Sequence, residues 1–294
     1  MLTKEELNAL VSQGPVLLDG ATGSYLRAKG MPRNCATEEW VLRNPEVLVE
    51  LQRGYRDAGS KIIYAPTFQA QPLALESIGL EKHTEAINAQ LLALSRSAAP
   101  GCLIAGDMAT LAAFCDSWDP DNFDLLVENY RRQIRGLIDG GADLLVGETL
   151  LYPQEAEAIL TAAELEGAGA TMITYSMQSG GFLYSGHDAG PLMEQLEHWG
   201  ACAVGFNCVA ADDMTAHLVS KLRRYTKLPL ISKPNAGNPI INEEGLAEYK
   251  LEPEPFANIQ LEAYHNGAAL LGGCCGTTPG HIGALKRLLE DNHE

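Results

Sequence analysis

Three cysteines stand at the ends of two apolar runs and are the side chains of this chain best suited to chemistry. Cys208 ends the run CAVGFNC, and Cys274 and Cys275 end the run AALLGGCC. Adjacent cysteines have a poor geometry for a disulfide with each other, whereas two thiolates on one turn suit a soft metal ion. Three thiolates leave one position of a tetrahedral zinc ion open, as in catalytic zinc sites. We therefore predict that these cysteines bind Zn2+, although Cys208 taken alone is equally well explained as a buried core thiol.

A zinc ion with three thiolate ligands favours a particular kind of reaction. The ligands leave the centre negatively charged, so it polarises carbonyls weakly and generates hydroxide poorly. It can instead bind a substrate thiol as the fourth ligand, and the bound thiol loses its proton near neutral pH and stays nucleophilic. The cysteines therefore indicate an enzyme that activates a thiol, for example for attack on a methyl group. A zinc-binding interaction module is the non-enzymatic alternative.

Two carboxylates follow apolar runs in the same way. Glu148 lies at the end of DLLVGET, where it can pair with the ammonium group of an amino-acid substrate. A carboxylate in the first turn of the next helix would have the same spacing, so both interpretations stay open. Asp19 is followed by Gly20 and Ala21, and the N–H groups of such small residues can bind a substrate carboxylate.

The elements that must position these residues alternate along the chain. Near-continuous apolar runs, typical of parallel strands covered on both faces, are PVLLDG (15–20), KIIYAPTF (61–68), CLIAGDM (102–108), DLLVGET (143–149), TMITYSM (171–177), CAVGFNC (202–208), LPLISKPN (228–235) and AALLGGCC (268–275). Amphipathic segments between them predict helices at Pro45–Ala58, Glu81–Ala98, Asp124–Asp139, Pro153–Glu166, Gly190–Trp199, Asp212–Tyr225, Pro253–Asn266 and Pro279–Glu290.

Eight such β–α units in 294 residues predict an α/β protein with a single (βα)8 TIM barrel domain over residues 1–294. The alternative, a doubly wound open sheet, usually carries a G-x-G-x-x-G loop after an early strand, and GATGS (20–24) does not match that loop.

In the barrel, polar residues gather at the carboxyl ends of the predicted strands, where barrel enzymes place their chemistry. These residues are Asp19, Thr67, Asp107, Glu148, Thr149, Asn207, Cys208, Lys233, Asn235, Cys274 and Cys275. We therefore expect the cysteines of the sixth and eighth strands to lie close together across the barrel mouth. The irregular stretch Lys233–Pro255, which follows the seventh strand, is a candidate loop for substrate contact.

Composition excludes several classes of protein. The net charge of −17, from 38 acidic and 21 basic residues, would repel nucleic acid. No apolar run approaches the roughly 18 residues of a membrane span, and the polar start MLTKEELNAL lacks the pattern of a secretory signal. We therefore expect a cytoplasmic protein without a membrane or nucleic-acid partner, whose seven cysteines are reduced thiols.

Motifs along nearly the whole chain resemble those of the homocysteine S-methyltransferase family. They are LLDGATGSYL (17–26), NPEVLVELQRGYRDAGSKIIYAPTFQA (44–70), GADLLVGET (141–149), VGFNC (204–208), KPNAGNP (233–239) and GGCCGTTPGHI (272–282). The similarity is closest to the homocysteine-binding module of cobalamin-dependent methionine synthases.

The resemblance implies a (βα)8 barrel that transfers a methyl group to the thiol of L-homocysteine and forms methionine. Zinc would be held by the three cysteines already singled out. The residues matching Glu148 and Asp19 would bind the homocysteine amino group, and the backbone around Gly20 and Ala21 would receive its carboxylate. Asn235, in PNAG, matches a position that can occupy the open zinc site when substrate is absent.

The methyl donor is less directly indicated. Betaine-using members enclose a quaternary ammonium with aromatic residues, whereas this chain has Gln69 and Ala36 at the matching places. We expect methylcobalamin or another methyl-corrinoid, supplied by a separate corrinoid protein because no cobalamin-binding module follows the barrel. The alternatives are S-methylmethionine as the donor, and a different small thiol or a selenol as the acceptor.

Overall fold

Eight parallel strands form the centre of the molecule in the computed structural model, which describes residues 1–243 and 245–292. Their order is β1-β10-β7-β6-β5-β4-β3-β2, and a parallel bridge between Leu18 and Ile62 places β2 beside β1 and closes the ring. The strands are β1 (Val16–Leu17), β2 (Ile62–Tyr64), β3 (Leu103–Ala109), β4 (Leu144–Leu150), β5 (Thr171–Tyr175), β6 (Ala203–Ala210), β7 (Leu230–Asn235) and β10 (Ala268–Leu271). Each lies within or next to one of the eight predicted runs, so the predicted (βα)8 barrel is confirmed.

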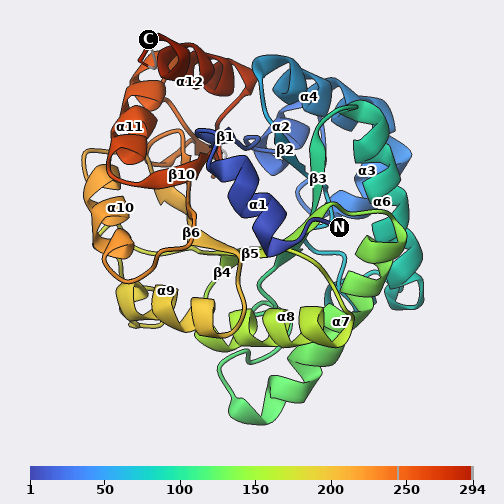
Figure 1. Ribbon diagram of the computed structural model, residues 1–294. Helices are drawn as coiled ribbons and strands as arrows, with labels where there is room; N and C mark the ends of the chain where they lie inside the picture. The colour runs from blue at the N-terminus through green and yellow to red at the C-terminus, as the bar shows by residue number, and fades with distance from the viewer. Residues whose placement is uncertain (244, 293–294) are drawn as a thin grey trace.

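Helices surround this ring, as Figure 1 shows. The helices predicted from the sequence are α4 (Pro45–Ala58), α6 (Thr84–Ala98), α7 (Phe123–Asp139), α8 (Pro153–Leu165), α9 (Ala189–His198), α10 (Thr215–Arg223), α11 (Pro253–His265) and α12 (Pro279–Asp291). Prolines at the start of α4, α8, α11 and α12 need no N–H partner there, which is why these helices begin where they do. The structure adds α1 (Lys4–Val11), α2 (Gly23–Ala28), α3 (Thr37–Arg43), α5 (Pro72–Glu76) and the 3-10 turns η1 (Glu81–His83) and η2 (Pro120–Asn122).

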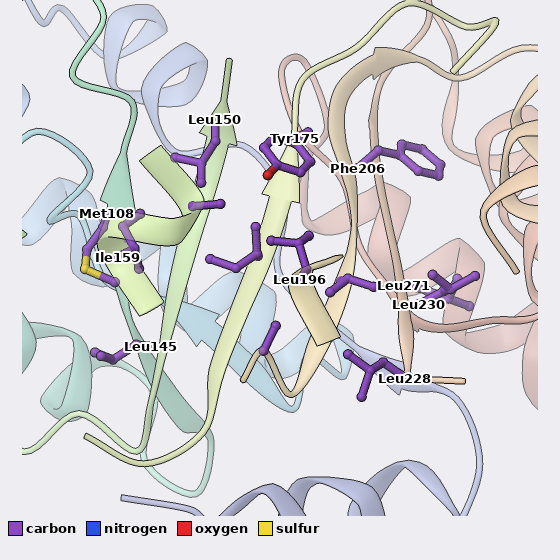
Figure 2. Close-up of a cluster of buried hydrophobic side chains, with 14 of the residues drawn as sticks. Met108, Leu145, Leu150, Ile159, Tyr175, Leu196, Phe206, Leu228, Leu230 and Leu271 are labelled. Carbon is purple, nitrogen blue, oxygen red and sulfur yellow. The ribbon is translucent and has the colours of Figure 1, made fainter. Parts of the chain in front are cut away.

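Successive side chains along each strand point alternately toward the helices and into the barrel, and this produces two apolar layers. Residues that point outward pack against the helices in the larger cluster, part of which Figure 2 shows, with Leu145, Phe206, Leu230 and Leu271 among its members. Their strand neighbours point into the barrel and form a separate cluster that includes Leu18, Ile62, Ala105, Val146, Met172, Ile231 and Leu270. Burial of both faces explains why the strands are apolar without alternation.

The α1 helix crosses one end of the barrel (Figure 1). Its Leu7 is fully buried in the inner cluster, and the segment before it is fixed by backbone hydrogen bonds from Leu2 to Asp143 and from Ala170 to Leu2. Both contacts lie at the amino ends of strands, so α1 covers the end opposite the polar residues.

The stretch Lys233–Pro255, predicted to be irregular, contains a small antiparallel hairpin of β8 (Ile240–Ile241) and β9 (Ala247–Glu248). Glu244 in this stretch lies outside the described residues. All seven cysteines are within the described part and are free thiols. No helix formed by residues 1–243 and 245–292 has the length and apolarity needed to cross a membrane.

Candidate active site

A polar layer lies directly above the inner apolar cluster, toward the carboxyl ends of the strands. Tyr64, Asp107, Glu148 and Lys233 each stand two residues beyond an inward-facing apolar residue of the same strand, so alternation turns them inward as well. These four line a cavity of about 380 Å³ whose wall also includes Asp19, Gly20, Ala21, Thr149, Cys208, Cys274 and Cys275. The structure therefore brings eight of the eleven predicted strand-end residues together in one space, whereas Thr67, Asn207 and Asn235 lie outside the cavity wall.

The three cysteines form a compact sulfur cluster at this mouth. Cys208 Sγ lies 3.4 Å from Cys274 Sγ and 3.7 Å from Cys275 Sγ, and all three sulfurs are within 4.8 Å of one another. A tetrahedral zinc ion with Zn–S bonds of about 2.3 Å separates its sulfur ligands by about 3.8 Å. Hydrogen bonds from Cys208 and Cys274 lower the pKa of the Cys275 thiol, whereas hydrogen bonds with Cys274 and Cys275 raise the pKa of Cys208. The geometry and the donor set fit zinc.

The backbone of Cys208 has an unusual, strained conformation that turns its side chain toward the other two cysteines. Among the described residues other than glycine, Cys208 (φ 57°) and Thr149 (φ 60°) are the two with positive φ. Each sits where a strand's register shifts, β6 after Asn207 and β4 after Gly147. Bulges of this kind redirect side chains and are common beside active sites.

Asn207 supports both irregularities from a fully buried position. Its Oδ1 accepts hydrogen bonds from Thr149 N (2.9 Å) and Thr174 Oγ1 (3.0 Å), while its Nδ2 donates to Thr149 Oγ1 (2.6 Å). The same Nδ2 lies 3.8 Å from Cys274 Sγ. Asn207 thus links the strand end that carries Glu148 to the sulfur cluster.

The loop with the cysteine doublet is fixed by its backbone. Cys274 N donates to Pro234 O (2.7 Å), and Cys275 N donates to the Asn235 side-chain oxygen (3.0 Å). Asn235, which the resemblance matched to a position that can occupy the open zinc site, is therefore beside the cluster and holds the backbone of Cys275. Thr277 Oγ1 donates to Cys274 O (2.7 Å).

Thr277 also connects this loop to the segment after β1. Its Oγ1 accepts the Ala21 N–H (3.1 Å), and Tyr55 Oη donates to Ala21 O (2.9 Å). The Ala21 N–H, expected to receive a substrate carboxylate, is therefore already paired. Neighbouring Gly20 has no room for a side chain, because a Cβ there would lie 2.6 Å from Tyr55 Oη.

Lys233 lies between the two predicted acidic residues. Its Nζ is 3.0 Å from Glu148 Oε1 and 3.5 Å from Asp19 Oδ1, and 4.6 Å from the centre of the Tyr64 ring. Burial raises the pKa of Asp19 to about 7, although Lys233 opposes this shift. Burial also raises the pKa of Glu148, again against the effect of Lys233. The sequence placed Lys233 at the end of a strand but gave it no role. The signal that could have indicated one is a lysine within the mainly apolar run LPLISKPN (228–235).

Thr67, grouped with the strand-end residues in the sequence, is not part of the cavity wall. Its hydroxyl accepts from Asp107 N (3.0 Å) and donates to Asp107 O (2.8 Å), so it fixes the end of β3. Gln69 N donates to the buried Glu38 (2.7 Å), while Phe68 and Tyr64 supply aromatic surface to the cavity.

Comparisons with known proteins show the family of the chain. A family model described as homocysteine S-methyltransferase matches residues 16–289. The homocysteine S-methyltransferase of Escherichia coli is 29% identical, with 97% of this chain and 99% of that protein aligned. Methionine synthase of Mycobacterium tuberculosis is 26% identical over 94% of this chain, which spans 25% of that protein.

A solved structure is also similar. The metallated form of the homocysteine methyltransferase MmuM from Escherichia coli matches with a TM-score of 0.81 and 28% identity, over 96% of this chain and 99% of that one.

Proposed function

The chain belongs to the homocysteine S-methyltransferase family of enzymes, and we propose that it methylates the thiol of L-homocysteine with zinc held by Cys208, Cys274 and Cys275. The observation that carries this proposal is the three-sulfur cluster in one cavity with Glu148 and Asp19. A metal store would not need an acidic wall beside the sulfurs, which argues against the interaction-module alternative.

Zinc, when bound there, would take the homocysteine thiol as a ligand and lower its pKa so that the thiolate forms near neutral pH. The protein's part is to keep three sulfur donors in place before substrate arrives. Asn207 and Thr277 do this by hydrogen bonds to the cluster and its loop. The strained backbone of Cys208 and the Asn235 contact to Cys275 N complete the support.

The amino-acid end of the substrate lies against the acidic wall in our proposal. Glu148 pairs with the ammonium group, and Asp19 adds negative charge to the same wall. The substrate carboxylate binds near Gly20 and Ala21; because the Ala21 N–H is paired with Thr277, Gly20 is the better candidate donor. Asn235, whose amide lies beside the sulfur cluster, occupies the space of the thiol when substrate is absent.

For the methyl donor we propose a methylated corrinoid, methylcobalamin or a related species, presented by a separate corrinoid protein. The support is the similarity to a methionine synthase over 94% of this chain, of which this chain corresponds to one quarter. A large planar donor needs an open mouth, and the cavity opens at the carboxyl ends of the strands.

S-methylmethionine is the second candidate donor. The match to the Escherichia coli homocysteine S-methyltransferase covers 99% of that protein, so a chain of this extent can be a whole enzyme of this family. Tyr64 and Phe68 give aromatic surface, and the acidic wall favours a cationic donor such as a sulfonium.

One experiment tests the function and separates the donors. Zinc-loaded protein and L-homocysteine are incubated in parallel with methylcobalamin, S-methylmethionine, betaine and methyltetrahydrofolate, and methionine is measured. We expect methionine with methylcobalamin at a rate well above that with betaine. Faster turnover with S-methylmethionine would replace the corrinoid proposal, and no methionine with any donor would contradict methyl transfer to homocysteine. A small-thiol or selenol panel under the same conditions tests the alternative acceptors.

A further inference from the structure

The cavity wall carries more negative than positive groups. Four of its ionisable side chains are almost fully buried, with exposed fractions of 1% for Asp19, 5% for Asp107, 7% for Glu148 and 3% for Lys233. An ionised group removed from water is costly unless a partner of opposite charge or a hydrogen bond compensates it. The protein supplies one ammonium group here for three carboxylates.

Lys233 serves two of these carboxylates. Its Nζ contacts Glu148 Oε1 at 3.0 Å and Asp19 Oδ1 at 3.5 Å. The other oxygen of Asp19, Oδ2, accepts the Tyr64 N–H at 2.8 Å. Oδ2 of Asp19 therefore has a hydrogen bond, and Oδ1, which makes none, has the ion pair with Lys233.

Asp107 has no comparable partner. Its Oδ1 is buried without a hydrogen bond, as are Asp19 Oδ1 and Glu148 Oε1. Lys233 forms an ion pair with each of those two residues, whereas no Lys, Arg or His among residues 1–243 and 245–292 forms one with Asp107. The backbone of Asp107 is held on both sides by the Thr67 hydroxyl, and Gln133 Nε2 also donates to its carbonyl (3.2 Å). A rigid backbone thus presents an unpaired carboxylate to the cavity.

Glu148 lies diagonally across from Asp107 on the next strand, because the register partner of Asp107 is Val146. On the parallel strands β3 and β4, Glu148 pairs in register with Ala109, which lies two residues after Asp107. The two carboxylates therefore face the cavity on adjacent strands. After burial, the charge of Glu148 is the largest influence that raises the pKa of Asp107. A cation between them would relieve both effects.

Resting on the proposed function, we infer that the α-ammonium group of the amino-acid substrate binds between Asp107 and Glu148, while Lys233 remains the counter-ion of Asp19. Asp107 thereby becomes a substrate-binding residue that selects thiols with an α-amino group. Asp19 acts on the substrate through Lys233 and does not contact it directly.

The test compares two ligands that differ only in the α-amino group, L-methionine and 4-(methylsulfanyl)butanoate. Their dissociation constants are measured by calorimetry with the zinc-loaded full chain. The variants are Asp107→Asn and Asp107→Ser, each of which removes the charge, with Asp19→Asn for comparison. Asp143→Asn is the matched control, because Asp143 lies at the amino end of β4 and pairs with Arg96.

We expect the unaltered protein to prefer L-methionine by about 10- to 100-fold, the range of a charge-assisted contact. Either Asp107 variant should lower that preference about tenfold or more, and by more than Asp19→Asn does, whereas Asp143→Asn should keep it within about threefold. The inference is overturned if the unaltered protein shows no preference, if both Asp107 variants retain it, or if Asp19→Asn is the variant that loses it.

Methionine formation from homocysteine by the unaltered protein is measured separately. A protein that forms no methionine but shows an Asp107-dependent preference contradicts the proposed function and supports the inference. A protein that forms methionine but keeps its preference for L-methionine in the Asp107 variants supports the proposed function and contradicts the inference.

Discussion

Thr149 and Asn207 form a reciprocal pair across the barrel mouth: Thr149 N donates to Asn207 Oδ1 (2.9 Å), and Asn207 Nδ2 donates to Thr149 Oγ1 (2.6 Å). Thr149 follows Glu148, and Asn207 precedes Cys208. One buried amide thus fixes the relative positions of the proposed ammonium site and the proposed metal site.

Replacement of Asn207 by Ala tests this link. The variant loses hydrogen bonds to Thr149 and Thr174 and leaves buried partners unsatisfied, so we expect a loss of about 2–4 kcal/mol in the free energy of unfolding. Zinc affinity should fall as well, because Cys208 loses its support. Urea unfolding and metal titration measure the two effects. Thr174→Val, which removes one of these bonds and keeps the reciprocal pair, is the control and should retain zinc affinity.

The sulfur cluster predicts a metal stoichiometry. Cys208→Ala, Cys274→Ala and Cys275→Ala should each lower bound zinc from one ion per chain to near zero, because two sulfurs cannot hold it tightly. The barrel should stay folded, since these half-buried side chains lie at a mouth and not in an apolar layer. Elemental analysis and circular dichroism give the two readouts. Cys115→Ala, at a half-buried thiol outside the cavity wall, should retain its zinc. Unfolding of all three site variants would indicate a structural metal instead.

Glu148→Gln should weaken homocysteine binding by about 1.5–3 kcal/mol, the usual scale for a hydrogen bond to a charged group. Zinc content should not change, because Glu148 is not among the three sulfur ligands. Calorimetry with L-homocysteine measures the affinity, and Glu128→Gln, at an ion pair on the surface of α7, is the control. An affinity equal to that of the unaltered protein would remove Glu148 from the substrate site.

Gly276 is the glycine of the cysteine loop with both positive φ (78°) and a close neighbour, since a Cβ would lie 2.2 Å from Tyr249 Cβ. Gly276→Ala should therefore cost the left-handed strain of about 1–2 kcal/mol and also displace Tyr249, whose side chain hydrogen-bonds Cys275 and lowers the pKa of that thiol. Gly101→Ala separates the two effects, because Gly101 has φ 87° and open space around it. We expect thermal destabilisation in both variants and reduced zinc affinity in Gly276→Ala alone. Equal zinc affinity in the two variants would show that Tyr249 has no influence on the site.

Sequence reasoning predicted the barrel because its strands are buried on both faces and read as apolar runs of strand length. It also predicted the strand-end gathering of Glu148 with the three cysteines, which follows from parallel topology alone. It could not predict that Lys233 reaches Asp19 and Glu148, because that contact depends on how far three strands shift along one another. The positive φ of Thr149 and Cys208 left no signal either, since neither residue type favours that conformation. The sequence showed Asp107 at a strand end, but only side-chain geometry shows that it lacks a partner.

The last prediction concerns the pH dependence of stability at Asp107. Burial raises the pKa of this carboxyl well above 3.8, and the charge of Glu148 raises it further. Lys233 opposes the shift, whereas the charges of Asp19 and Cys274 add to it. Below pH 3.8 the carboxyl is protonated in both the folded and the unfolded chain, so it contributes no difference. As the pH rises, the unfolded chain ionises first, and the folded protein loses about 1.4 kcal/mol per pH unit until the folded pKa is reached.

Asp107→Asn cannot ionise, so it avoids this loss. We expect the variant to match the unaltered protein near pH 4 and to have the higher unfolding free energy at pH 8. Chemical denaturation at the two pH values measures the difference, and Asp143→Asn, at a carboxylate that pairs with Arg96, should show no such gain. A carboxylate kept for structural reasons would give the opposite result, a less stable variant at pH 8. If Asp107 lacks a partner in the protein because it binds a cation of the substrate, Asp107→Asn should be more stable and should also bind amino-acid ligands more weakly. Both results together are expected only in that case.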